Sequence, residues 1–237
     1  MKYMGSKSRI FKDIYPIIFK NINSEATFYD ACCGGGNFID KVPNHIKRIG
    51  IDINPYVIGA LCLIRDNINS LPKNNKEFAI DDYKRYQYDT TLDIGMRGYV
   101  GFALSYGGKW FGGWRRDQEN KRDYIAEAYN NAVKQSLLLQ GCTFVINDFM
   151  NIEYKQNSII YIDPPYNNTT KYKNINFNYD SFWGWVRIMS KSGYNIYVSE
   201  YNAPNDFECI YEKKIKSSLT KDTGAKDSVE RLFKYKY

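Results

Sequence analysis

Neighbouring groups around residue 163 suit the recognition of an amine on a flat ring. The carboxylate of Asp163 and the carbonyl oxygen of Pro164 are both acceptors, so together they can take the two hydrogens of an exocyclic amine. Tyr166 can stack on the ring that carries this amine. Asp163-Pro164-Pro165-Tyr166 therefore predicts a site that grips a nucleobase by its edge and its face. The simpler interpretation is a proline-rich turn after an ordinary strand.

The residues before Asp163 predict the element that positions this corner. Residues 159–162 form a short apolar run rich in β-branched side chains, which favours a buried strand. Pro164 and Pro165 end the strand, because neither has an N–H group to donate and both have a fixed φ. In open α/β sheets, ligands bind at the carboxyl ends of the strands.

A glycine turn near the start of the chain predicts a cofactor site. Residues 27–32 read as a strand that runs into Cys33-Gly34-Gly35-Gly36 and a helix over about 37–43. Glycines and a helix N-terminus allow close approach of a cofactor. The next strand, 48–52, ends in Asp52 roughly 20 residues later, where a nucleotide fold needs a carboxylate for a ribose. Because the full phosphate-binding glycine pattern is missing, S-adenosylmethionine suits better than a phosphate-rich cofactor. A plain flexible loop is the alternative.

Composition narrows the class of protein. The 237 residues suffice for one large domain, or for one domain with an inserted lobe, and the net charge of +7 suits a polyanionic partner. We find no bilayer-spanning apolar stretch and no secretory apolar region, so we expect a cytoplasmic protein without membrane contact. The five cysteines lack a Cys-x-x-Cys pair and there is one histidine, which argues against disulfides and against a metal site.

Residues 70–141 are interpreted as an insertion into the nucleotide-binding fold. Apolar periodicity predicts a helix over 119–140 there. The segment 106–116 combines two glycine pairs, aromatic residues and a basic end, a mix expected of a nucleic-acid contact. Its predicted DNA-binding residues are Lys109, Arg115 and Arg116. The alternative, core aromatics bracketed by glycine turns, is equally supported.

The remaining segments complete the expected fold. Periodicity predicts helices over 11–22, 55–69 and 180–191, and strands over 143–146 and 195–199. The polar run 167–178 is expected to order on substrate binding, with Lys171 as a further DNA contact. Strands over 207–216 and 229–237 predict a lysine-rich hairpin suited to lie along phosphates, although such charge runs are usually solvated faces.

Taken in order, these motifs resemble the Dam-type (alpha group) DNA adenine N6-methyltransferases over nearly the whole chain. The resemblance rests on five blocks. They are Lys2-Tyr3-Met4-Gly5-Ser6-Lys7, Asp30-Ala31-Cys32-Cys33-Gly34-Gly35-Gly36, Asp52-Ile53-Asn54-Pro55, Asn147-Asp148-Phe149 and Asp163-Pro164-Pro165-Tyr166. The chain departs from that family where Ala31 and Cys32 replace Pro-Phe, and in lacking an Asn-Pro-Tyr type recognition signature. The resemblance therefore does not extend to the recognised DNA sequence.

The resemblance implies a fold and a set of site residues. The fold is a Rossmann-like α/β S-adenosylmethionine-dependent methyltransferase with a mixed central sheet and a C-terminal β-hairpin. Its catalytic domain is 1–69 and 142–237, with an inserted, mainly helical target-recognition lobe at 70–141. S-adenosyl-L-methionine is the implied cofactor, S-adenosyl-L-homocysteine its product, and no metal is required. The implied cofactor contacts are Tyr3, Lys7, Asp30, Gly34, Gly36, Asp52, Asp148 and Asp163, and the implied catalytic residues are Asp163, Pro164 and Tyr166.

The implied function is site-specific transfer of a methyl group to the N6 amine of a flipped adenine in double-stranded DNA. A monomer or weak dimer is expected, with a cognate restriction endonuclease as a further partner if the chain serves restriction–modification. Two alternatives stay open. One is the same chemistry on adenine in RNA or on another amine, and the other is a catalytically silent DNA-binding relative. Retention of both Asp52 and Asp163 disfavours the silent relative.

Overall fold

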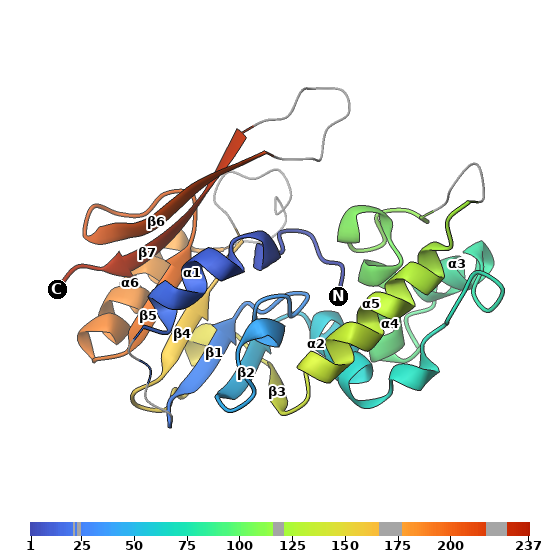
Figure 1. The fold of residues 1–237 in the computed structure, drawn as a ribbon, viewed down its shortest axis with the longest axis horizontal. Coiled ribbons are helices and arrows are strands. Elements are labelled where there is room, and N and C mark those ends of the chain that lie inside the picture. Colours follow the sequence, from blue (N-terminus) through green and yellow to red (C-terminus); the bar gives the residue numbers. More distant parts are fainter. Residues whose placement is uncertain (21, 23–24, 116–120, 166–176, 217–226) are drawn as a thin grey trace.

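A single seven-stranded sheet organises the chain (Figure 1). The computed structural model describes residues 1–237 except 21, 23–24, 116–120, 166–176 and 217–226. The strands follow one another across the sheet in the order β3-β2-β1-β4-β5-β7-β6. Their bounds are β1 Thr27–Ala31, β2 Lys47–Asp52, β3 Cys142–Ile146, β4 Ile159–Ile162, β5 Asn195–Ser199, β6 Phe207–Lys216 and β7 Asp227–Tyr235.

Strand directions confirm the Rossmann-like, mixed sheet with a C-terminal hairpin. Strands β1 to β5 pair in parallel, whereas β7 runs antiparallel to both β5 and β6. Strand β1 lies directly beside β4, and the chain order proceeds outward from this pair in both directions. The carboxyl ends of β1 and β4 therefore form the topological switch point, where open α/β sheets bind ligands.

Helices cover both faces of the sheet. The α-helices are α1 Phe11–Ile18, α2 Pro55–Asp66, α3 Ile80–Tyr88, α4 Ile94–Ala103, α5 Tyr124–Leu138 and α6 Tyr179–Lys191. Short 3-10 turns are η1 Lys7–Arg9, η2 Ile39–Lys41, η3 Ile68–Ser70, η4 Tyr106–Gly108 and η5 Phe149–Asn151. Side chains alternate across β1, so that Phe28 joins the core with α1 and α2 while Tyr29 joins the core with α6. None of the described helices is long and apolar enough to cross a bilayer.

Residues 70–141, which the sequence predicts to be an insertion and which are called the inserted lobe below, pack closely on the rest of the described chain. Helices α3, α4 and α5 lie with α2 on one side of the molecule (Figure 1), and residues of α4 and α5 share a buried apolar cluster with α2 and β1. The sequence pattern did not predict helix α4, because its glycines have a low helix propensity. Here those glycines let α4 approach α2: a Cβ at Gly98 would lie 1.9 Å from the carbonyl oxygen of Tyr56, and one at Gly95 2.8 Å from that of Gly59.

Several predicted helix bounds were wrong for local reasons. The helix expected over 37–43 is only the 3-10 turn η2, because Pro43 holds Val42 in an extended conformation. The helix expected over 119–140 begins at Tyr124, where the Asp123 side chain accepts from the N–H of Ala126 and caps it. The helix expected over 11–22 ends at Ile18, and the one expected over 55–69 ends at Asp66.

Candidate active site

Asp163 lies at the switch point, directly after β4. Its backbone N–H donates to the carbonyl oxygen of Ala31 at 3.4 Å, which ties the corner to the end of β1. Tyr179, the first residue of α6, donates its hydroxyl to the carbonyl oxygen of Pro165. The corner is thus held from two sides. Tyr166 lies outside the described residues.

Lys7 joins the N-terminal segment to Asp163. Its Nζ lies 3.3 Å from Oδ1 of Asp163 and 3.2 Å from Oε2 of Glu230, and its side chain is only 7% exposed. Although burial lowers it, attraction by Asp163 and Glu230 raises the pKa of Lys7 above its usual value. Lys7 is therefore a cation at neutral pH, fixed between two carboxylates.

The glycine turn after β1 has a backbone that only small residues allow. Cys32, Gly34 and Gly36 all have positive φ. A Cβ at Gly34 would lie 2.8 Å from the Tyr3 ring, and one at Gly36 would lie 2.9 Å from Leu61. The turn is compact and is covered on one side by Tyr3.

Asp52 and Asp30 fix this turn through backbone hydrogen bonds. Asp52 Oδ2 accepts from the N–H of Gly34 at 3.0 Å, and its Oδ1 accepts from the N–H of Asn54 at 2.9 Å. Asp30 is buried, and its Oδ2 accepts from the N–H of Ile39 at 3.2 Å. Burial raises the pKa of Asp52, and burial with repulsion from Asp163 raises the pKa of Asp30 well above its usual range.

Several carboxyl groups lie near Cys32. Burial raises the pKa of the Cys32 thiol well above its usual value, and nearby carboxylates, those of Asp52 and Asp163 foremost, raise it further. Burial disfavours any charge here, whereas the carboxylates disfavour only a negative one. The carboxylates at this end of the sheet, partly offset by the Lys7 ammonium, therefore favour a cation over an anion beside Asp163.

Comparison with known proteins identifies the family. Residues 3–144 match the D12 class N6 adenine-specific DNA methyltransferases, a span of more than half of the chain. The protein belongs to this family. The predicted resemblance is thereby confirmed at the level of adenine-specific DNA methyltransferases. The matched span contains Lys7, the glycine turn and Asp52, and it ends before Asp163.

Individual relatives are more distant. The chain is 24% identical over 195 residues to the Type II methyltransferase M.FokI of Planomicrobium okeanokoites, covering 72% of this chain and 29% of that protein. The chain thus spans less than a third of this curated relative's length.

The likenesses to solved structures are weak. The rRNA methyltransferase aviRa from Streptomyces viridochromogenes has a TM-score of 0.46 at 11% identity, over 98% of this chain and 86% of that chain. The Escherichia coli protein yhhF has a TM-score of 0.40 at 11% identity, over 98% of this chain and 85% of that chain. Likenesses this weak carry no conclusion about function.

In this D12 family member, the fold gathers most of the predicted cofactor residues. Tyr3 lies against Gly34, Lys7 contacts Asp163, and Asp52 bonds to the glycine turn. Asp148 follows β3 and caps η5 by accepting from the N–H of Met150 at 2.9 Å. Their proximity fits the predicted site, and their individual roles stay predictions.

Of the predicted DNA-binding residues that the structure describes, one is exposed and one is largely buried. Lys109 is exposed on a loop whose Gly108 carbonyl accepts from the N–H of Met4, so the loop adjoins the N-terminal segment. Arg115 is only 9% exposed, pairs with Glu127 at 3.3 Å and lies over the Tyr124 ring. It is thus held within the inserted lobe. Arg116 and Lys171 lie outside the described residues.

The aromatic residues of this loop mostly support the lobe. Trp110 packs on Tyr56 and Phe102, and Trp114 packs between Phe78 and Tyr83. Tyr106 differs, since its side chain is 68% exposed. The alternative interpretation, core aromatics bracketed by glycine turns, therefore describes Trp114 better than a stacking platform does.

Two residues of the site were missed by sequence reasoning. Glu230 of β7 reaches Lys7, and Gln135 of α5 donates to the carbonyl oxygen of Gly35 at 3.0 Å and to Asp40 at 2.9 Å. Neither has a neighbouring motif, because the contacts join segments far apart in the chain. Gln135 fixes the glycine turn from the inserted lobe.

Proposed function

We propose that this chain is a Dam-type, site-specific DNA methyltransferase that transfers a methyl group from S-adenosylmethionine to the N6 amine of adenine. Family membership supports adenine in DNA as the substrate. The decisive observation is the position of Asp163 and Pro164 at the switch point, beside the glycine turn that Asp52 fixes. An acceptor pair for the amine thus adjoins the predicted cofactor site.

The residues present fit S-adenosylmethionine. Asp52 has two oxygens that each accept one N–H, and a carboxylate can accept about four hydrogen bonds, so it retains capacity for ribose hydroxyls. Tyr3, Lys7, Asp30, Gly34, Gly36, Asp148 and Asp163 are the proposed remaining contacts. When bound, the cofactor supplies an activated methyl group on a positively charged sulfur.

The protein's own groups prepare the adenine for reaction. The N6 amine is a weak nucleophile because its lone pair is delocalised into the ring. Hydrogen bonds from this amine to Asp163 and to the Pro164 carbonyl localise the lone pair and orient it. Lys7 holds the Asp163 carboxylate in place. The adenine must first leave the duplex, at a cost of a few kcal/mol, and Tyr166 is proposed to stack on it.

The remaining parts of the proposal concern DNA and partners. Residues 70–141 would read the target, with Lys109, Arg116 and Lys171 contacting DNA beside the catalytic parts 1–69 and 142–237. Arg115, which pairs with Glu127, would support the lobe instead. A cytoplasmic location, a monomeric or weakly dimeric state and a cognate restriction endonuclease complete the proposal. The net charge of +7 supports binding to a polyanion.

Sequencing of DNA from a host without its own adenine methylase tests the proposal directly. Expression of the chain should produce N6-methyladenine in one sequence context, and Asp163→Ala should abolish it while the protein stays folded by circular dichroism. Purified protein should transfer tritiated methyl groups to DNA in preference to RNA or protein. Transfer to RNA alone, or unchanged activity of Asp163→Ala, would refute the proposal.

A further inference from the structure

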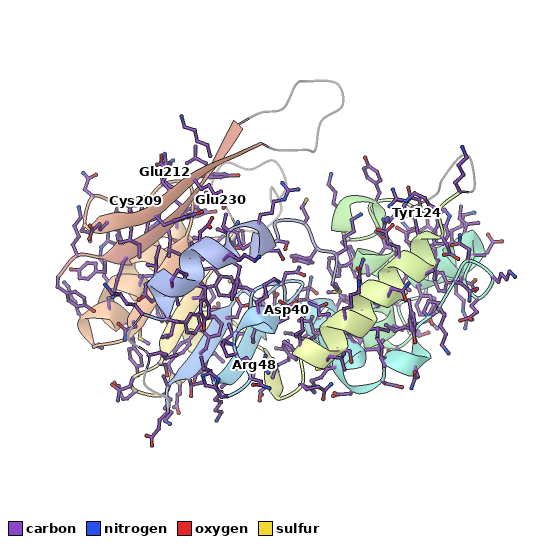
Figure 2. The ribbon with its side chains drawn as sticks, in the orientation of Figure 1. Asp40, Arg48, Tyr124, Cys209, Glu212 and Glu230 are labelled. Atoms are coloured by element: carbon purple, nitrogen blue, oxygen red, sulfur yellow. The ribbon has the colours of Figure 1, made fainter. Side chains whose placement is uncertain are left out.

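Glu230 connects the C-terminal hairpin to the site. It lies on β7, which pairs with β5 on one side and with β6 on the other (Figure 2). Its side chain is 12% exposed, and its Oε2 lies 3.2 Å from Nζ of Lys7. The same nitrogen lies 3.3 Å from Oδ1 of Asp163. One buried ammonium is therefore divided between a carboxylate of the hairpin and the carboxylate of the Asp163 corner.

We propose that Glu230 is a positioning residue for methyl transfer, which acts by sharing the charge of Lys7 with Asp163. This inference rests on the proposed function. Lys7 orients Asp163, yet an ammonium that engages a carboxylate fully also withdraws its capacity to accept other hydrogen bonds. Glu230 offsets this effect by drawing part of the Lys7 charge toward β7. Asp163 then stays oriented and remains a strong acceptor for the adenine amine.

The low exposure of the three groups makes this sharing effective. Their side chains are 7%, 12% and 20% exposed for Lys7, Glu230 and Asp163, so water screens their charges weakly. A neutral amide at residue 230 would leave the Lys7 charge to Asp163. In Glu230→Gln, Asp163 would therefore accept a hydrogen bond from the adenine amine less strongly. Because this bond activates the reacting amine, we expect kcat to fall at least about tenfold, with DNA affinity nearly unchanged.

The same hairpin supplies a matched control. Glu212 lies on β6 of the same hairpin (Figure 2). It also pairs with a cation of β7, since its Oε2 lies 2.7 Å from Nε of Arg231. Its side chain is 49% exposed, and surface pairs of this kind contribute little to stability. Glu212→Gln therefore makes the same chemical change in the same hairpin without touching Lys7.

The experiment compares kcat and KM for four variants at saturating S-adenosylmethionine. These are Glu230→Gln, Glu212→Gln, Lys7→Met and the double variant Lys7→Met with Glu230→Gln. We expect Glu230→Gln to lower kcat, Glu212→Gln to match the parent, and the double variant to be no slower than Lys7→Met. That non-additivity distinguishes an effect through Lys7 from general damage to the hairpin.

Two results would overturn the inference. One is a Glu230→Gln variant with parental kcat, and the other is a double variant whose loss equals the product of the two single losses. Circular dichroism and urea unfolding confirm that each variant folds. A parent chain with no methylation of DNA would instead refute the proposed function, so the two failures are distinguishable.

Discussion

Substitution of Gly98 by alanine tests how the inserted lobe is attached to the cofactor end of the sheet. Helix α4 approaches α2 through glycines, and a Cβ at Gly98 would lie 1.9 Å from the carbonyl oxygen of Tyr56 and 3.1 Å from Cβ of Ala60. Tyr56 is in the first turn of α2, shortly after Asp52. Gly98→Ala should therefore disturb both the packing of the lobe and the position of Asp52.

The size of the effect follows from the contact. Real Cβ atoms essentially never approach another heavy atom closer than 3.0 Å, so α2 and α4 must separate by about 1 Å. The obstructing atom is a helix carbonyl, which cannot rotate away as a side chain can. Overpacking costs typically 1–3 kcal/mol, and alanine regains about 1 kcal/mol of helix propensity. Because a 1.9 Å approach to a backbone oxygen calls for the upper end of that range, about 3 kcal/mol, we expect a net loss of about 2 kcal/mol in the free energy of unfolding.

Urea unfolding measures this loss, and a second glycine provides the control. Gly184 lies inside α6, and a Cβ there would have nothing within 4 Å. Gly184→Ala should stabilise the protein by ~0.5–1 kcal/mol, because alanine favours the helix. Gly98→Ala should also weaken S-adenosylmethionine binding, measured by calorimetry. Equal stability changes for the two variants would show that α2 and α4 do not pack as described.

Further predictions concern charged groups. Asp52→Asn should raise the dissociation constant of S-adenosylmethionine by ~10- to 100-fold, because it removes a charged acceptor, and should leave DNA affinity unchanged. Equal cofactor affinity of the variant and the parent in calorimetry would contradict the ribose role of Asp52. Burial, with repulsion from Asp163, raises the pKa of Asp30, so the folded protein keeps a proton that the unfolded chain releases above about pH 4. The parent therefore loses stability relative to Asp30→Asn as pH rises above that value, and a pH-independent difference in urea unfolding would refute this. Lys109→Gln should weaken DNA binding and reduce the slope of log K against log salt by about 1, and an unchanged slope would place Lys109 away from phosphates.

Local sequence determined the strands and turns that build the site. The strands predicted over 159–162, 195–199 and 207–216 have those bounds in the structure, and helix 180–191 differs by one residue. Each is specified by its own apolar pattern and by flanking breakers, such as the prolines after residue 162. The glycine turn and Asp52 were likewise recognisable from the sequence. Backbone positions with a positive φ favour glycine, and Asp52 directly follows the apolar residues of its strand.

Tertiary packing determined the contacts between residues that lie far apart in the sequence, which local sequence patterns do not specify. Helix α4 is stable despite its glycines because their lack of a Cβ lets it pack against α2, a partner that lies far away in the sequence. Arg115 has the appearance of a DNA contact in the sequence, yet the fold pairs it with Glu127. Glu230 lies on β7, outside the predicted motifs, and meets Lys7 only because β7 pairs with β5 and brings the hairpin to the N-terminal segment. A residue's type fixes what chemistry it can do, whereas the partner that it meets depends on how distant segments pack.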